Sequence, residues 1–332
     1  MAISPSNSEA LLLGGKIETF AVPGSRTVHG KTFPLGIRPK DDQQFQTVES
    51  AVEYVKELAK TGVFDQLLSQ HGTILFRHFP IRNAKDFSSF VRAFNLPQPH
   101  KEIGLAGIRT LVTTDVKTAN EEPPDVKFYY HSEYGRSAHF PAVLFFYSEI
   151  VPHTGGQTPI LSSVELYDRL KEELPEFVKD LSDKEVQHAK VEAVLQNDLK
   201  AEAVWQPNGA LHVLQRLPAI RRIASTGKPT FFNGFAGVYG RAKDNAALAP
   251  PYRGLDNKYH LPTTYGDGSP IPNEYLDRLL DLSDEIGFLV PWQEGDVAFI
   301  DNYTVQHARS PWEGKRSLLV SLWDGNEKFV PL

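Results

Sequence analysis

The chain of 332 residues contains no cysteine, and its only methionine is Met1. The lack of cysteine excludes disulfides, thiol nucleophiles, cysteine-ligated zinc and iron–sulfur clusters held by cysteine. Any bound metal must therefore be held by histidine, aspartate or glutamate. A basic excess is also missing, because 35 Lys and Arg stand against 41 Asp and Glu, a formal net charge of −6. A surface that binds nucleic acid needs such an excess, so the composition predicts no nucleic-acid partner.

Long apolar runs are absent as well. No run approaches the ~18 to 20 residues that a membrane-spanning helix requires, which predicts no membrane partner. The first residues carry no basic segment, and the three leucines at 11–13 are too short for the apolar part of a signal peptide. We therefore expect a cytoplasmic protein. Hydrophobic residues make up 41% of the chain, which is typical of a folded protein with a sizeable core.

The pattern along the chain predicts strands flanked by helices. Residues 1–45 are rich in Ser, Pro and Gly and are expected to form an irregular arm, with one short strand at 16–22. Residues 46–332 are expected to form a single domain. Strands are predicted at 72–77, 141–150, 296–300 and 317–323, helices at 48–55, 86–94, 162–183 and 274–286, and a long loop at 249–272. Strands and helices do not alternate regularly, which argues against a doubly wound parallel sheet.

The most informative motif is His131-Ser132-Glu133, which follows a run of aromatic residues. In an extended segment, residues i and i+2 point to the same face, so one imidazole and one carboxylate can converge on a metal. A second pair with this spacing, His100 and Glu102, lies in a turn-rich segment and is interpreted as part of a solvated loop. Because such pairs also arise by chance, the motif needs support from elsewhere in the chain.

That support lies near the end of the chain, where a predicted strand, a polar turn and His307 follow one another, with Arg316 nine residues further on. Two histidines and one carboxylate bind Fe(II) on one face and leave three positions open, as in non-haem oxygenases. A cation on a strand is costly to bury without an anion, so Arg316 indicates an anionic ligand. Asp301 is a rival carboxylate and is interpreted as a partner that orients a metal ligand.

These motifs, together with Pro152-His-Thr-Gly-Gly-Gln-Thr158-Pro159, resemble the clavaminate synthase-like branch of the taurine dioxygenase (TauD/TfdA) family. Members are iron(II), 2-oxoglutarate-dependent oxygenases, and the resemblance covers roughly residues 70–325. It implies a mainly β fold with helical insertions around a double-stranded β-helix, the cupin-like jelly-roll. It also implies three iron ligands, His131, Glu133 and His307, two residues on the distal carboxylate of 2-oxoglutarate, Thr158 and Arg316, and dioxygen (O2) at the remaining position.

Two residues depart from the taurine dioxygenase pattern. Glu133 stands where that branch usually has aspartate, as in the clavaminate synthase variant, and whether it ligates through one or both oxygens is left open. Val320 stands where the branch has a second arginine, four residues after the first. Whatever that arginine does must be absent or supplied elsewhere, which argues against a sulfonate substrate.

The resemblance implies oxidation of a C–H bond in a small polar metabolite, such as an amino acid or a derivative in secondary metabolism. Hydroxylation, desaturation and cyclisation are all open, with succinate and CO2 formed from 2-oxoglutarate. Asn120, Tyr134 and Asn233 are candidates for contact with the substrate. Two other functions stay open from the residues: a non-catalytic, cupin-like metal-binding protein, and a zinc-dependent hydrolase or isomerase that uses the same three ligands. The sequence does not predict the substrate or the oligomeric state.

Overall fold

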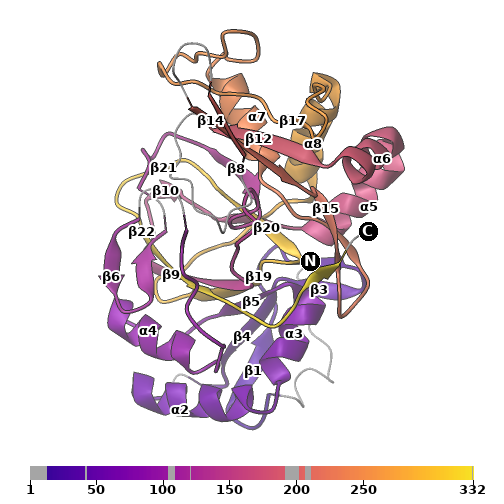
Figure 1. The fold of residues 1–332 in the computed structure, drawn as a ribbon. Helices are drawn as coiled ribbons and strands as arrows, with labels where there is room; N and C mark the ends of the chain where they lie inside the picture. The colour runs from indigo at the N-terminus through magenta and orange to yellow at the C-terminus, as the bar shows by residue number, and fades with distance from the viewer. Residues whose placement is uncertain are drawn as a thin grey trace.

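The computed structural model describes residues 13–41, 43–103, 109–119, 121–190, 202–205, 211–330 and 332. Within these ranges the chain is mainly β, with seven helices set around the strands (Figure 1). The expected mainly β fold with helical insertions is confirmed at this level. No helix in the described ranges is long and apolar enough to span a bilayer.

The largest sheet has eight strands. In order across the sheet they are β1 (Ile17–Phe20), β4 (Leu35–Pro39), β5 (Thr73–Phe76), β19 (Val297–Asp301), β9 (Val143–Ile150), β22 (Ser317–Trp323), β7 (Val116–Thr118) and β6 (Leu111–Thr113). Neighbours are antiparallel except β4 and β5, which run parallel. At its centre Phe145 and Phe299 lie opposite each other, and their ring centroids are 4.3 Å apart. The four strands predicted in the domain are confirmed.

A smaller antiparallel sheet packs against one face of the large sheet. Its strands, in order, are β18 (Phe288–Leu289), β11 (Pro159–Ser162), β20 (Val305–Arg309) and β8 (Phe128–His131). One apolar core contains side chains of both sheets, such as Ile160 and Val305 from the small sheet and Leu144, Phe146 and Val320 from the large one. Because side chains alternate along a strand, the residue two after Val305 also faces this space between the sheets.

The helices cover the outer faces of the two sheets. Apolar side chains of α2 (Val48–Ala59), α3 (Val63–His71) and α4 (Ala84–Arg92) pack on the large sheet. Those of α5 (Ser163–Glu173), α6 (Pro175–Lys184), α7 (Phe235–Asp244) and α8 (Asn273–Ile286) pack behind the small sheet. In Figure 1 the first group lies at the bottom of the molecule and the second in its upper part. The helices predicted at 48–55, 86–94 and 274–286 are confirmed.

The remaining strands form smaller sheets. They are β13 (Glu202–Trp205), β14 (Leu211–Leu217), β12 (Val186–Lys190) and β17 (Thr264–Tyr265) in one, β16 (Pro229–Phe231), β15 (Ile220–Ile223) and β23 (Phe329–Val330) in another, and the pairs β2 (Arg26–Val28) with β3 (Lys31–Phe33) and β10 (Thr154–Gly155) with β21 (Trp312–Glu313). The segment 249–272, predicted as a loop, contributes β17, which pairs with β12.

Two predictions need correction. The helix predicted at 162–183 is two helices, because Pro175 begins the second one and the preceding Leu174 has φ −131° and ψ 58°, outside the helical region. Proline disfavours helical backbone in the residue before it. The first 45 residues, expected to be irregular apart from one strand, carry four strands in their described part, and β1 and β4 join the large sheet. Buried Ile17, Leu35 and Ile37 hold these strands on the core.

Candidate metal centre

His131 and His307 lie side by side on adjacent strands of the small sheet. His131 ends β8 and pairs in register with His307 of β20, and their ring centroids are 4.4 Å apart. The ring of His307 also packs edge-to-face against Phe146, on β9 of the large sheet, with the ring centroids 5.3 Å apart. The Nδ1 atom of His131 lies 2.9 Å from the carbonyl oxygen of Tyr129. Because a carbonyl only accepts, Nδ1 carries the proton and Nε2 keeps its lone pair for a metal.

Glu133 follows β8 by two residues, and the turn after β19 holds its backbone. The N–H of Glu133 donates to Oδ1 of Asn302 at 2.8 Å, and Nδ2 of Asn302 donates to the carbonyl oxygen of Glu133 at 3.0 Å. Asn302 is itself fully buried. The backbone N–H and the carbonyl oxygen of Glu133 are therefore both bonded to the turn after β19. These two bonds fix the backbone that carries the carboxylate.

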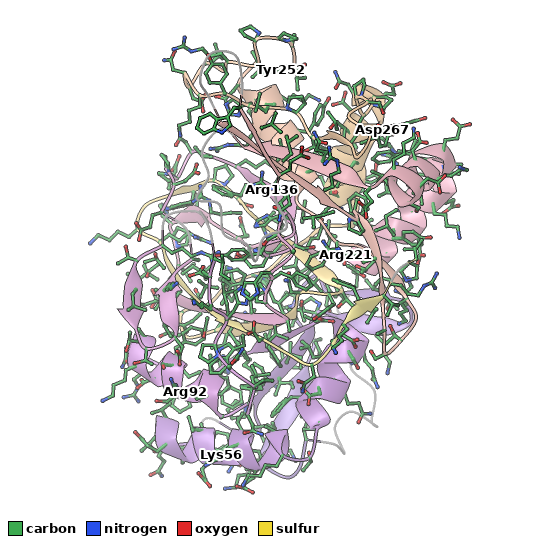
Figure 2. All side chains as sticks on the ribbon, in the orientation of Figure 1. Lys56, Arg92, Arg136, Arg221, Tyr252 and Asp267 are labelled. Atoms are coloured by element: carbon green, nitrogen blue, oxygen red, sulfur yellow. The ribbon has the colours of Figure 1, made fainter. Side chains whose placement is uncertain are left out.

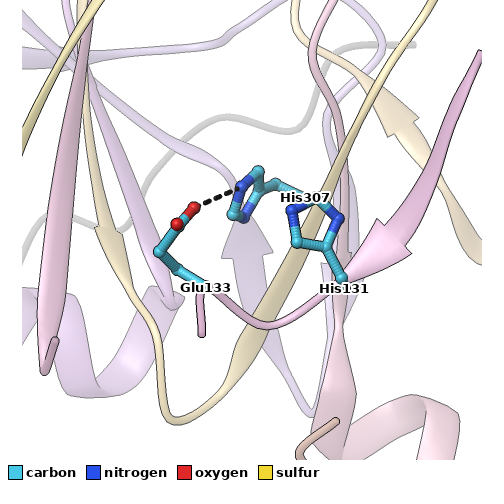
Figure 3. Close-up of side chains that lie close together, drawn as sticks. All are labelled: His131, Glu133 and His307. Carbon is cyan, nitrogen blue, oxygen red and sulfur yellow. Dashed lines mark ion pairs between the residues drawn. The ribbon is translucent and has the colours of Figure 1, made fainter. Parts of the chain in front are cut away.

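The three side chains converge on one point between the sheets, as Figure 3 shows. One nitrogen or oxygen of each lies within 4.8 Å of the others, and Oε2 of Glu133 lies 3.2 Å from Nε2 of His307. Metal bonds of about 2.1 Å at right angles put neighbouring ligand atoms about 3 Å apart, so this separation suits a shared ion. Glu133 and His307 are 4% and 5% exposed. Oε2 of Glu133 and Nδ1 of His307 have no hydrogen-bond partner among the described residues.

The protonation states also suit a metal. Burial and the charge of His307 lower the pKa of His131 to about 4, so His131 is neutral at neutral pH. Burial alone would raise the pKa of Glu133, but the charge of Arg109, followed by His307 beside it, holds it well below the usual range. Metal ligands must be deprotonated carboxylate and neutral imidazole, and the surroundings of Glu133 and His131 favour these states.

A network that the motifs did not reveal holds the other oxygen of Glu133. Arg109 donates from Nη2 to Oε1 of Glu133 at 2.9 Å and from Nη1 to Oε1 of Glu102 at 3.1 Å. Glu102 also accepts from Tyr134 at 2.8 Å and from Lys117. The interpretation of His100 and Glu102 as a solvated loop is therefore wrong, since His100 is buried and Glu102 supports the site. No spacing rule marks Arg109, because it meets Glu133 only in space.

Arg316 lies one residue before β22, on the same alternation as Leu318 and Val320, which face the small sheet. Its Nε donates to the carbonyl oxygen of Gly156 at 2.9 Å, and its guanidinium stacks on Trp312 at 5.0 Å. Among the described residues it forms no ion pair. Burial, and then the charge of Arg309, lower the pKa of Arg316 to about 10. Gly156, at φ +69°, leaves this space, because an added Cβ would lie 3.0 Å from Cδ of Arg316.

With this geometry in view, comparison with known proteins gives a clear result. Residues 42–323 match the profile of the family described as "Taurine catabolism dioxygenase TauD, TfdA family". The chain belongs to the TauD/TfdA family. The resemblance drawn from the motifs is thereby confirmed, and the chain is a dioxygenase of the class that uses Fe(II) and 2-oxoglutarate.

Two relatives align along most of this chain. A clavaminate synthase-like protein of Arabidopsis thaliana is 32% identical, with 91% of this chain and 96% of the relative covered. The dapdiamide synthesis protein DdaC of Enterobacter agglomerans is 28% identical, with 84% and 90% covered. Among solved structures, PvcB of Pseudomonas aeruginosa has a TM-score of 0.51 at 14% identity, covering 98% of this chain and 94% of PvcB. This last likeness supports the shared fold.

The other predicted residues of this TauD/TfdA chain have different surroundings. Thr158 is buried, and its Oγ1 accepts from Nε1 of Trp292 at 3.0 Å. Tyr134 reaches Glu102, as described above. The side chain of Asn233 is bonded within the protein, to Ala219 at 3.2 Å and to the N–H of Phe235 at 3.3 Å. Asn120 lies outside the described residues.

Asp301 holds the turn that leads into β20. Its carboxylate accepts from the N–H of Tyr303 at 3.0 Å and from Oγ1 of Thr304 at 2.6 Å. The described contacts include none between Asp301 and His307, so the expected orienting role finds no support in them. The residue that does hold a predicted ligand is the adjacent Asn302, in the predicted polar turn before His307.

Proposed function

We propose that this dioxygenase oxidises a C–H bond of a small polar metabolite in secondary metabolism, with an amino acid or its derivative as the first candidate. Hydroxylation, desaturation and cyclisation are the possible outcomes. The observation that carries the proposal is the cluster of two histidines and one carboxylate, in which Oε2 of Glu133 has no hydrogen bond and lies 3.2 Å from Nε2 of His307. The names of two similar proteins lend support to a role in secondary metabolism. DdaC is a dapdiamide synthesis protein, and PvcB is an oxygenase from an isonitrile synthetic pathway.

His131, Glu133 and His307 are proposed to hold Fe(II). Bound together, Fe(II), 2-oxoglutarate and O2 supply the oxidation of the substrate, and 2-oxoglutarate leaves as succinate and CO2. Because Oε1 of Glu133 already accepts from Arg109, the unpartnered Oε2 is the atom left for the metal. We therefore propose that Glu133 ligates through one oxygen. The small sheet, which carries His131 and His307, and the large sheet that it faces would form the double-stranded β-helix that the family resemblance implies.

Thr158 and Arg316 are proposed to bind the distal carboxylate of 2-oxoglutarate. Arg316 is a largely buried cation without an anion among the described residues, and burying a guanidinium alone is costly. Gly156, whose carbonyl oxygen accepts from Nε of Arg316, lies two residues before Thr158 in the chain. The Thr158 hydroxyl accepts from Trp292, so its own hydrogen is free to be donated to a carboxylate. Arginine suits this task because its planar fork can bind both oxygens.

The remaining roles and partners rest on the sequence. Asn120, Tyr134 and Asn233 stay candidates for contact with the substrate, and Asp301 for support of a ligand. A small-molecule substrate follows from membership of this enzyme family. A cytoplasmic location, and the lack of nucleic-acid and membrane partners, stay predictions from composition.

The deciding experiment is anaerobic addition of Fe(II) and 2-oxoglutarate, followed by absorption spectroscopy. A weak charge-transfer band at ~500 nm is expected of iron chelated by 2-oxoglutarate at a site with open positions. The His307→Ala variant should lose this band, while His153→Ala, a change at an exposed histidine, should keep it. A band that survives His307→Ala would overturn the ligand assignment.

The same preparation separates the other two functions. A metal-binding protein without turnover would bind Fe(II) but form no succinate from 2-oxoglutarate in air. A zinc hydrolase or isomerase would work without O2 and show no band. Succinate formation that requires both Fe(II) and O2 is the result expected here.

A further inference from the structure

Arg109, Arg221 and Arg136 are three arginines that differ in what their side chains meet. Arg109 forms ion pairs with Glu133 and Glu102. Arg221 packs its guanidinium on three phenylalanine rings at 4.7 to 5.3 Å, and its Nε donates to the carbonyl oxygen of Pro218. Arg136 has no hydrogen bond, ion pair or aromatic partner among the described residues. Arg136 therefore lacks a counter-charge among the described residues, as Arg316 does.

Arg136 lies beside the proposed metal ligands. It is three residues after Glu133, in a tight turn in which Gly135 donates to Ser132 and Ser137 donates to Tyr134, each at 2.9 Å. The path of this turn is fixed, because a Cβ on Gly135 would lie 2.6 Å from the backbone of Asn233. Any substitution at Gly135 would therefore displace the turn that carries Arg136.

Gly234 brings the stem of Arg136 next to His131. A Cβ added at Gly234 would lie 3.4 Å from Cγ of Arg136 and 3.6 Å from Cβ of His131, so both side chains border the same small space. The side chain of Arg136 therefore begins beside the ligand cluster.

Arg136 is open to solvent beside the ligand cluster. The residue is exposed, yet the protein atoms around its guanidinium lower its pKa by burial. Figure 2 labels Arg136 near the middle of the view. A guanidinium that is exposed and starts beside the ligand cluster can be reached by a substrate.

We propose that Arg136 binds a carboxylate of the substrate and so positions the reacting C–H bond beside the iron. This inference rests on the proposed function and narrows its substrate class to molecules that carry a carboxylate. The unpaired guanidinium offers two parallel N–H donors, which match the two oxygens of a carboxylate. β22 offers no cation for this purpose, because Val320 is buried in the apolar core between the sheets.

The test uses protein loaded with Mn(II) and saturated with 2-oxoglutarate in the absence of oxygen. Calorimetric titration compares matched probes, L-arginine with L-argininamide, L-glutamine with L-glutaminamide and L-leucine with L-leucinamide, because each pair differs in one carboxylate charge. For at least one pair we expect wild type to bind the acid about 10- to 100-fold more tightly than the amide, the effect of a charged hydrogen bond. Arg136→Gln should abolish this preference, and Arg136→Lys should restore part of it.

Arg92→Gln is the matched control, since it removes the same charge from α4, in the lower part of the molecule in Figure 2. It should behave as wild type. Equal binding of acid and amide to wild type in every pair, or an acid preference that survives Arg136→Gln, would overturn the inference. Failure of the proposed function has a different signature, because the Fe(II) and 2-oxoglutarate band would then be missing from wild type itself. A band with no acid preference refutes the role of Arg136 alone.

Discussion

Two buried groups of charges in this protein are built on opposite principles. Arg77 and Asp296, at 7% and 1% side-chain exposure, join β5 to β19 through two short bonds, 3.0 Å from Nε to Oδ1 and 2.7 Å from Nη2 to Oδ2. The remaining capacity is also used, because Arg77 donates to the carbonyl oxygen of Pro291 and Asp296 accepts from the N–H of Gln293, both at 2.8 Å. This pair is complete without any ligand.

The metal centre lies where the small sheet faces this large sheet, and it is incomplete by the same measure. Oε2 of Glu133 and Nδ1 of His307 lack hydrogen bonds, and Arg316 has no anion among the described residues. Each lack costs stability, because buried polar groups and charges are favourable only when paired. The difference distinguishes structural charges from charges that bind a ligand. Structural charges are paired within the protein. Charges that bind a ligand have no partner in the protein, and the ligand offsets the cost in stability.

The largest expected effect comes from breaking the complete pair. Asp296→Ala should lower the free energy of unfolding by about 3 to 5 kcal/mol, because Arg77 would stay buried without its counter-charge. Urea unfolding of the metal-free protein measures this loss. Asp183→Ala, which removes an exposed partner of Lys179 on α6, is the control and should change stability little. Equal losses in the two variants would show that burial and completeness do not distinguish the Arg77 pair.

A smaller effect, of a different kind, is expected from the incomplete group. Arg316→Gln should weaken 2-oxoglutarate binding about 10- to 100-fold, since a charged hydrogen bond to the distal carboxylate is lost. The metal-free protein should not lose stability, because the variant removes a buried charge that has no counter-ion among the described residues. Titration of the ~500 nm band with 2-oxoglutarate measures the first, and urea unfolding the second. A loss of stability comparable with that of Asp296→Ala would place Arg316 with the structural charges.

Part of the ligand cluster could be predicted from sequence because its signal is local. His131 and Glu133 share one face of an extended segment, whereas His307 lies far along the chain and joined them through the order of the motifs and the family resemblance. The core strands were equally legible from their aromatic and branched residues. The end of a helix before Pro175 is also a local signal. The prediction of one helix over 162–183 did not take this proline into account.

The support of the site could not be predicted in this way. Arg109 reaches Glu133 from a segment 24 residues away in sequence, and Asn302 from 169 residues away. Neither contact leaves a periodic trace, because it depends on how the sheets stack. Arg136 lies three residues after Glu133 in the sequence, yet its lack of a partner is seen only in the folded structure. A sequence alone does not show which charged residues form ion pairs.

The smallest expected effect concerns Asp301, which is intermediate between the two groups, since it accepts hydrogen bonds from Tyr303 and Thr304 but has no cation. Burial raises the pKa of Asp301 to about 6, above its ordinary value of about 4. The folded protein therefore binds this proton more tightly than the unfolded chain, so the stabilisation is full below pH ~4 and is lost as the pH rises through about 6.

Asp301→Asn has no such proton to lose. Relative to wild type, its free energy of unfolding should rise by about 1 to 2 kcal/mol between pH ~4 and ~7, a figure reduced for the partial exposure of the residue. Urea unfolding at the two pH values measures the change, and a difference between the proteins that is constant with pH would show that Asp301 is as well compensated as Asp296.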